Sequence, residues 1–259
     1  MEKTATPRTR TSALTRSQQI LDLLTERHVP MTTYELAKGS GAPPSTVYKL
    51  IDEMVEGLML SRLADGRIWL GPRLMRYGLA YRARMNAFNE AERAMYDLNE
   101  RIGEMIQICI RDEGSMSVVG MAEGRGPFRV TSDVGTRVPL NWTASGRLLV
   151  GHLSDTERRE IFAACAQPSG TGLAETDPDR LAALSSEAFR EGLSVQIDTS
   201  EEAVACIAAP IRGPDGACLM TLSVVMPKHR VHEKLDIAAT EVRNAARSVE
   251  KALGWHGDI

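Results

Sequence analysis

One short stretch constrains the fold of this chain more than any other, the segment STVYKLIDEMVEGLM from Ser45 to Met59. Its apolar residues recur with helical spacing and define one face: Val47, Leu50, Ile51, Met54, Val55 and Leu58. The opposite face starts with short hydrogen-bonding side chains, a phenol and a cation: Ser45, Thr46, Tyr48 and Lys49. The first turn of a helix offers unpaired N–H groups and the positive end of the dipole, so it suits contact with anions and acceptors. The stretch therefore predicts an amphipathic helix with an outward recognition face.

Two shorter helical patterns precede this helix, and a hairpin follows it. Apolar residues between positions 14 and 24 predict the first helix. Thr32 and Glu35 have capping-box spacing at the start of the second. After the third helix, Asp65-Gly66 separates two short apolar runs, which predicts a tight hairpin. Three helices followed at once by a hairpin are the order of a winged helix-turn-helix.

Charge is divided unevenly along the chain. Residues 1–84 contain 13 Lys and Arg against 8 Asp and Glu, a net charge of +5, whereas residues 85–259 contain 18 against 26, a net charge of −8. The total of −3 hides this division. The basic part favours contact with a polyanion such as DNA, and the acidic part disfavours it.

The acidic part of the chain mixes strand-like and helical patterns. Strands are predicted over residues 105–112, 115–124, 128–135, 193–200, 204–212 and 218–227. Helices are predicted over residues 155–165, 177–192 and 233–253, and Ser154 with Glu157 has capping-box spacing before the first of these. Together these elements predict an antiparallel sheet covered by helices, which is an α+β fold.

A long helix is predicted to begin at Leu74, between the basic and the acidic parts. Apolar residues occupy every seventh position of it: Leu74, Tyr81, Phe88, Met95 and Ile102. Such a seam either pairs with a second helix, which predicts self-association, or packs on its own domain. The sequence leaves both alternatives open.

Several classes of protein are disfavoured by the sequence. It has no run of 18 apolar residues, and its N-terminus lacks the apolar region of a secretory signal, so we expect a cytoplasmic protein without membrane contact. Its four cysteines form no C-x-x-C pair, so neither a disulfide framework nor a zinc cluster is expected. His229 and His232 could share a metal by spacing, but no cysteine or second ligand pair is near them. We therefore expect no metal.

Enzyme signatures give no support for catalysis. The sequence contains no G-x-S-x-G elbow, P-loop, dinucleotide fingerprint or H-E-x-x-H, so we expect no cofactor and no enzyme. One alternative is a small-molecule hydrolase, using a serine such as Ser145, with an accessory DNA-binding domain. Another alternative is a purely architectural DNA-binding oligomer. That hypothesis gives no role to the large acidic α+β part of the chain.

Several motifs in order resemble one family, the IclR-type bacterial transcription regulators. The segment STVYKLIDEMVEGLM resembles its recognition helix, and DGRIWLGPRLMRYG resembles its wing and exit. Two later segments resemble its effector-binding domain, VGTRVPLNWTASGRLLVGHLS and REGLSVQIDTSEEAVACIAAPIRGPDG. The resemblance implies a winged helix-turn-helix over residues 13–73, a linker helix over 74–100 and a GAF-like effector-binding domain over 101–259. Residues 1–12 are expected to form a disordered basic arm, and the protein is expected to form dimers that associate into tetramers.

The DNA contacts are expected from the recognition helix and the wing. We expect these residues to meet double-stranded operator DNA: Ser45, Thr46, Tyr48, Lys49, Arg62 and Arg67. A mobile arm is expected to add Arg8, Arg10 and Arg16. A solvated surface is the alternative for each of them.

The effector contacts follow from the resemblance. It implies apolar walls from Val130, Val138 and Ala144, and polar or polarizable contacts from Ser145, Gln196, Cys206 and Ser223. Trp142 stands where the family often has a small residue, so it either fills part of the pocket or forms an aromatic wall. Gln196 stands where the family often has an acidic residue. Residues 144–146 start a helix that suits a carboxylate. We expect a small organic acid to control operator binding or activity, although each residue would also fit a plain core.

Overall fold

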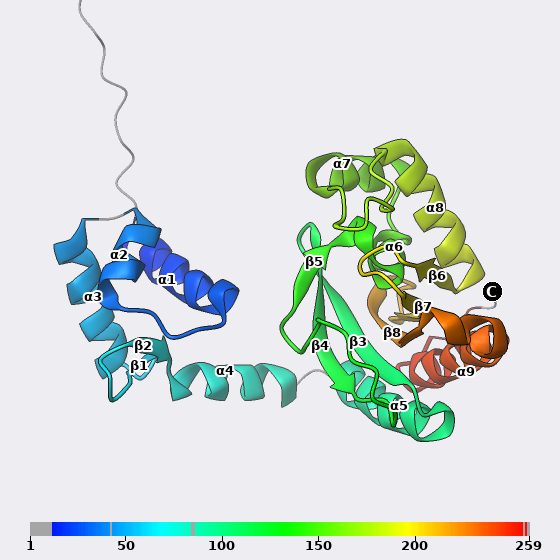
Figure 1. Cartoon of the computed structure of the whole chain (residues 1–259), viewed down its shortest axis with the longest axis horizontal. Coiled ribbons are helices and arrows are strands. Elements are labelled where there is room, and N and C mark those ends of the chain that lie inside the picture. Colours follow the sequence, from blue (N-terminus) through cyan, green and yellow to red (C-terminus); the bar gives the residue numbers. More distant parts are fainter. Residues whose placement is uncertain (1–11, 42, 84–85, 256, 258–259) are drawn as a thin grey trace, which may run out of the picture. The chain divides into compact units, whose positions relative to one another are not determined.

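The computed structural model describes residues 12–41, 43–83, 86–255 and 257, and the chain divides into two compact units, Met1–Arg84 and Met85–Ile259 (Figure 1). The expected arm of residues 1–12, with Arg8 and Arg10, lies outside the described residues except for Ser12, which caps the first helix. Each unit has its own apolar core.

The first unit contains three helices followed by a two-stranded hairpin: α1 (Ala13–Arg27), α2 (Thr33–Ser40), α3 (Pro44–Glu56), β1 (Leu60–Arg62) and β2 (Ile68–Leu70). The predicted capping box of Thr32 and Glu35 is confirmed, because each side chain accepts from the backbone N–H of the other. Gly66 adopts φ of 82° in the turn between the strands. One core joins the three helices to the hairpin through Ile20, Leu36, Val47, Ile51 and Ile68. These features confirm the winged helix-turn-helix.

Two helices stand where the sequence predicts one long helix, α4 (Pro72–Ala83) and α5 (Asn86–Ile102). Helix α4 leaves Met75, Tyr77 and Leu79 exposed. Helix α5 instead buries Phe88 and Met95 in the core of the second unit. The predicted seam is therefore wrong for Phe88 and Met95, which follow the alternative of packing on their own domain. The spacing could not distinguish the two, because any helix covering a sheet repeats its apolar residues in this way.

The second unit is built on a six-stranded antiparallel sheet with strand order β5-β4-β3-β8-β7-β6. Its strands are β3 (Met105–Asp112), β4 (Ser115–Ala122), β5 (Arg137–Pro139), β6 (Ser194–Ile197), β7 (Val204–Arg212) and β8 (Cys218–Pro227). The strand predicted over residues 128–135 is wrong, because this segment runs as a loop before β5. Its apolar residues Phe128 and Val130 pack on Met105 and Val225 of the sheet instead of pairing with a strand.

Helices cover both faces of this sheet (Figure 1). One face packs on α5 and α9 (Val231–Ala252), and the other lies under α6 (Ala144–Val150), α7 (Asp155–Cys165) and α8 (Pro178–Glu191). Short 3-10 turns, η1 (Leu140–Trp142) and η2 (Lys228–Arg230), precede α6 and α9. Alternate residues of β8 point to opposite faces, so Leu222 and Val224 join the core beneath α9, while Ser223 and Val225 face the other side. The predicted α+β fold is confirmed.

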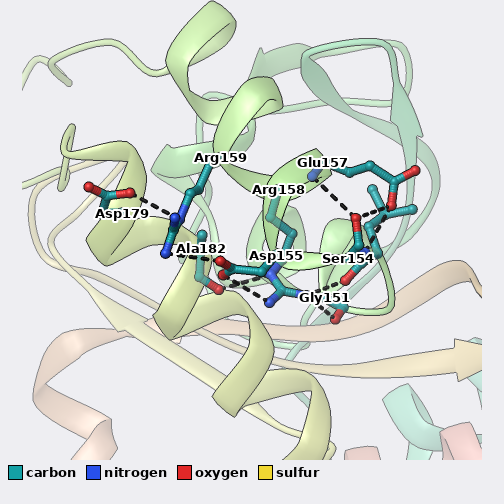
Figure 2. A network of polar contacts seen from close by, with 9 residues as sticks. Gly151, Ser154, Asp155, Glu157, Arg158, Arg159, Asp179 and Ala182 are labelled. Carbon is teal, nitrogen blue, oxygen red and sulfur yellow. Dashed lines mark hydrogen bonds and ion pairs between the residues drawn. The ribbon is translucent and has the colours of Figure 1, made fainter.

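Buried arginine contacts hold α7 and α8 together (Figure 2). Arg158 of α7 donates from Nε to the carbonyl oxygen of Ala182 on α8 at 3.0 Å, and from Nη1 to that of Gly151 at 3.4 Å. The neighbouring Arg159 forms an ion pair with Asp179 of α8 at 3.0 Å. The buried Arg158 contact and the exposed Arg159 pair thus join α7 to α8.

Candidate functional sites

The first candidate site is the exposed first turn of α3. Ser45, Thr46, Tyr48 and Lys49 are all exposed, whereas Val47 between them is buried in the core. Helix α3 begins without a side-chain cap. Uncapped helix starts carry partial positive charge and can bind acceptors from outside.

A side chain of α1 joins this turn. Arg16 lines a surface depression of about 370 Å³ together with Ser45, Thr46 and Lys49. The prediction that placed Arg16 in a mobile arm is wrong, because Arg16 is the fourth residue of α1. Two cations and two hydroxyls converge here, which matches the chemistry of a phosphate group. The Glu53 carboxylate also lines the depression, 3.8 Å from Lys49 Nζ, in an exposed pair that a phosphate can displace at small cost.

The wing arginines are already paired with carboxylates. Arg62 donates to Asp52 of α3 at 2.8 Å, and Arg67 donates to Asp65 of the hairpin turn at 2.6 Å. Hydrogen bonds from the backbone and side chain of Arg67 lower the pKa of Asp65. Both pairs are exposed, so they can exchange with phosphate oxygens at small cost. These ion pairs were not predicted from the sequence, although it contains both carboxylates, Asp52 and Asp65.

The second candidate site is a cavity of about 150 Å³ in the second unit, on the α6 side of the sheet. Of the eight residues expected to bind an effector, seven line it: Val130, Val138, Trp142, Ser145, Gln196, Cys206 and Ser223. Ala144 does not line it, because Ala144 is fully buried between α6 and Ala208 of the sheet. Sequence reasoning missed the contributions of β3 and β4, among them Gln107, Cys109, Met116 and Val118. Side chains alternate between the two faces of a strand, so the residues of β3 and β4 that face the cavity could have been predicted from this alternation.

Three polar side chains of the cavity lack a nitrogen or oxygen partner. Both amide atoms of Gln196 are buried and make no hydrogen bond within the protein. The buried Ser145 and Ser223 hydroxyls lie beside the thiols of Cys109 and Cys206, which are weak hydrogen-bonding groups. The exposed fractions of Ser145, Ser223 and Gln196 are 1%, 0% and 6%. A buried polar group left unpaired costs about 1–3 kcal/mol. Buried polar groups in proteins are normally hydrogen-bonded, so these atoms mark a place where bound molecules supply the missing partners.

The cavity lining is neutral apart from one carboxylate. Glu201 is the charged residue among the described lining residues, and its Oε2 accepts from the backbone N and from Oγ1 of Thr131 at 3.3 and 3.0 Å. Burial raises the pKa of the Cys109 thiol to about 11 and that of Cys206 to about 12, so both stay protonated at neutral pH. The lining thus offers no cation to balance an anionic ligand.

The expected carboxylate site at the start of α6 is partly filled by the chain itself. Thr143 caps this helix, and its Oγ1 accepts from the Gly146 N–H at 2.9 Å. The adjacent Ser145 hydroxyl lies beside the protonated Cys109 thiol and has no nitrogen or oxygen partner, so no base in the described chain contacts it. Trp142 Nε1 donates to the Gln167 carbonyl oxygen at 2.9 Å, which holds the indole at the cavity wall.

Clusters of metal-ligating side chains and membrane-spanning helices are both absent from the described part of the chain. No group of three or more His, Cys, Asp or Glu residues there could hold a metal ion. His229 and His232, paired by spacing in the sequence, belong to different elements, η2 and α9. None of the described helices is long and apolar enough to cross a membrane.

Two family models match the chain. The model described as "IclR helix-turn-helix domain" matches residues 13–63, and "Bacterial transcriptional regulator IclR C-terminal" matches residues 79–251. The chain belongs to the IclR family. It is accordingly a transcription regulator with an N-terminal helix-turn-helix DNA-binding domain and the C-terminal domain of the IclR family.

Curated and solved IclR proteins resemble the chain over most of their length. The HTH-type transcriptional regulator KipR of Bacillus subtilis is 27% identical over 88% of this chain and 92% of its own. The HTH-type transcriptional repressor AllR of Escherichia coli is 26% identical over 93% and 90%. A crystal structure of an IclR homolog from Microbacterium hydrocarbonoxydans, complexed with 4-hydroxybenzoate, is 26% identical with a TM-score of 0.82 over 93% and 99%. These relatives are transcription regulators, and they give the hydrolase alternative no support.

Proposed function

We propose that the first turn of α3 and the wing bind operator DNA, and that the cavity of the second unit binds the effector that changes this binding. The observation that carries the proposal is the cavity itself, where Ser145, Gln196 and Ser223 keep buried polar atoms without a nitrogen or oxygen partner. Its volume of about 150 Å³ equals that of an engineered cavity that holds one benzene ring, so the effector is a ring-sized metabolite. The solved relative with 4-hydroxybenzoate supports this size.

The DNA contacts divide by chemistry. Lys49 and Arg16 neutralise phosphates, and Ser45 and Thr46 donate to phosphates or to base edges. Tyr48, with 47% of its surface exposed, contacts a phosphate or a thymine methyl group. Arg62 and Arg67 of the wing meet the backbone or the minor groove by leaving their carboxylate partners.

The working unit that we propose is a homodimer that can pair into a dimer of dimers. Two winged domains in a dimer read two inverted half-sites, so the operator is a pseudo-palindrome. The exposed Met75 and Leu79 lie four residues apart on α4 and supply an apolar face for the partner helix. A regulator of this kind works in the cytoplasm, where the DNA is, and acts by allostery without catalysis.

A two-stage experiment tests the proposal. A thermal-shift screen of small organic acids, amides and aromatic catabolites finds compounds that stabilise the full chain. Fluorescence anisotropy then measures affinity for an operator selected from random duplexes, with and without the hit. A compound that stabilises the protein but leaves operator affinity unchanged would count against effector control.

Assembly is tested separately by analytical ultracentrifugation. The variant Met75→Glu, Leu79→Glu should lower the oligomeric mass, because two charges replace an apolar contact. A folded variant that keeps the wild-type mass removes α4 from the interface. Phe88 is unsuited to this test, because it belongs to the core of the second unit.

A further inference from the structure

Both amide atoms of Gln196 lack a partner inside the cavity, and this decides which effectors fit. Gln196 lies on β6 opposite Cys206 of β7, and its side chain is directed into the cavity that both residues line. Its Oε1 needs a donor and its Nε2 needs an acceptor, and neither is satisfied within the protein. A complementary ligand must therefore present a donor and an acceptor side by side.

We infer that the cavity selects an uncharged, single-ring compound carrying a carboxamide or lactam edge over the carboxylate of the same shape. The inference rests on the proposed effector role of the cavity and names the chemical class of the effector. It replaces the organic acid that the sequence predicts.

A carboxamide meets both needs of Gln196 at once. Its N–H donates to Oε1 and its carbonyl oxygen accepts from Nε2, which pairs two amide edges in one plane. An ionised carboxylate only accepts, so Oε1 would stay buried and unpaired. If the Gln196 amide is rotated by 180°, Oε1 and Nε2 exchange places, and the ligand must still present one donor and one acceptor side by side.

Charge acts in the same direction. The Glu201 carboxylate stands at the wall, and the described lining contains no Lys, Arg or His. The protonated thiols of Cys109 and Cys206 carry no charge, and the Gln107 amide already donates to Ser132 Oγ at 2.9 Å. An anion moved here from water would lose its hydration and gain no counter-charge.

The remaining polar groups accept either class. The Ser145 and Ser223 hydroxyls both donate and accept, so they orient a ligand without choosing its charge. Val118, Val130 and Val138 supply apolar wall for one ring. The discrimination between amide and acid therefore falls on Gln196 and Glu201.

Calorimetry with matched probes tests the inference on the full chain at neutral pH. The probes are 4-hydroxybenzamide against 4-hydroxybenzoate and benzamide against benzoate, which differ only in the group presented to Gln196. We expect each amide to bind at least about tenfold more tightly than its acid, the equivalent of about 1.4 kcal/mol. In Gln196→Met, which keeps the volume but not the amide, this ratio should fall to about twofold.

Two further variants separate the causes. Glu201→Gln should strengthen binding of both acids while leaving the amides nearly unchanged, because it removes only the like charge. Ser145→Ala should weaken all four probes alike and preserve the ratio. Acids that bind wild type as tightly as the amides, an amide preference that survives in Gln196→Met, or a lack of binding by all four probes would each overturn the inference. Operator affinity measured with the bound probe is a separate readout, and its failure to change would overturn effector control alone.

Discussion

The two units place their functional side chains in opposite environments. In the first unit, the residues of α3 and of the wing proposed to meet DNA are exposed, and Lys49 and the wing arginines already have carboxylate partners in solvent. In the second unit, Ser145, Gln196 and Ser223 are buried and have no nitrogen or oxygen partner within the protein. A polyanion can be bound by charges that merely exchange partners, whereas a small ligand is recognised by polar groups that only it can satisfy. We therefore expect DNA binding to depend strongly on salt and effector binding to depend on the geometry of the cavity.

Ion pairs show the same contrast. The Arg62 and Asp52 side chains are 43% and 69% exposed, while those of Arg212 and Glu250 are 6% and 1% exposed. Arg212 also stacks on the rings of Phe189 and Trp255, with its guanidinium carbon 4.5 and 4.9 Å from their centroids. The buried pair joins β7 to α9, so it holds the sheet to the helix behind it.

The largest expected effect comes from breaking that buried pair. Arg212→Ala should lower the free energy of unfolding of the second unit by about 3–5 kcal/mol, because the buried Glu250 loses the guanidinium and keeps the backbone N–H of residue 212 as its donor. Urea unfolding followed by circular dichroism measures the loss. The double variant Arg212→Met, Glu250→Leu should recover most of it, since apolar residues of similar volume replace both charges. A single variant as stable as wild type would show that water reaches Glu250.

A smaller effect of opposite sign is expected in the cavity. Gln196→Met should raise the free energy of unfolding of the ligand-free protein by about 1–3 kcal/mol, because it removes buried amide atoms without partners. Differential scanning calorimetry measures the change in the transition of the second unit. Gln19→Met, on the exposed side of α1, is the matched control and should leave stability unchanged. A destabilised Gln196→Met would mean that bound water already satisfies the amide.

On the DNA side, Lys49→Ala should weaken operator binding several-fold and reduce the slope of log K against log salt by about 0.9, the value for one lost phosphate contact. Arg67→Ala should act in the same direction but less, since Asp65 pairs with Arg67 at 2.6 Å, more closely than Glu53 pairs with Lys49 at 3.8 Å. Anisotropy titrations between low and moderate salt provide the slopes. Arg93→Ala, an exposed arginine of the second unit, is the control. Slopes equal to wild type in both variants would remove Lys49 and Arg67 from the interface.

The smallest expected change comes from Asp52→Asn. Loss of an exposed pair should lower the free energy of unfolding of the first unit by less than about 1 kcal/mol. Operator affinity should rise, because Arg62 is released and a negative charge is removed from the recognition helix. Weaker binding would instead show that the pair positions the wing against α3.

Local signals in the sequence predicted much of this fold. The capping boxes at Thr32 and Ser154 and the strands β3, β7 and β8 occur where the pattern places them. The signal for each lies in residues only a few positions apart, so it can be recognised without knowing the tertiary structure. The two-domain organisation followed from the division of charge and from the order of three helices and a hairpin.

Only the tertiary structure decided which partner each face or side chain meets. Periodicity marks Phe88 and Met95 as buried, but the core of their own unit, formed by the sheet and α9, buries them. Arg62 finds Asp52 through the fold of the wing, and Gln107 joins Ser145 at one cavity although they come from different elements. Sequence spacing records which side of an element is apolar or polar. What that side touches depends on contacts between residues far apart in the chain, and these form only when the core closes.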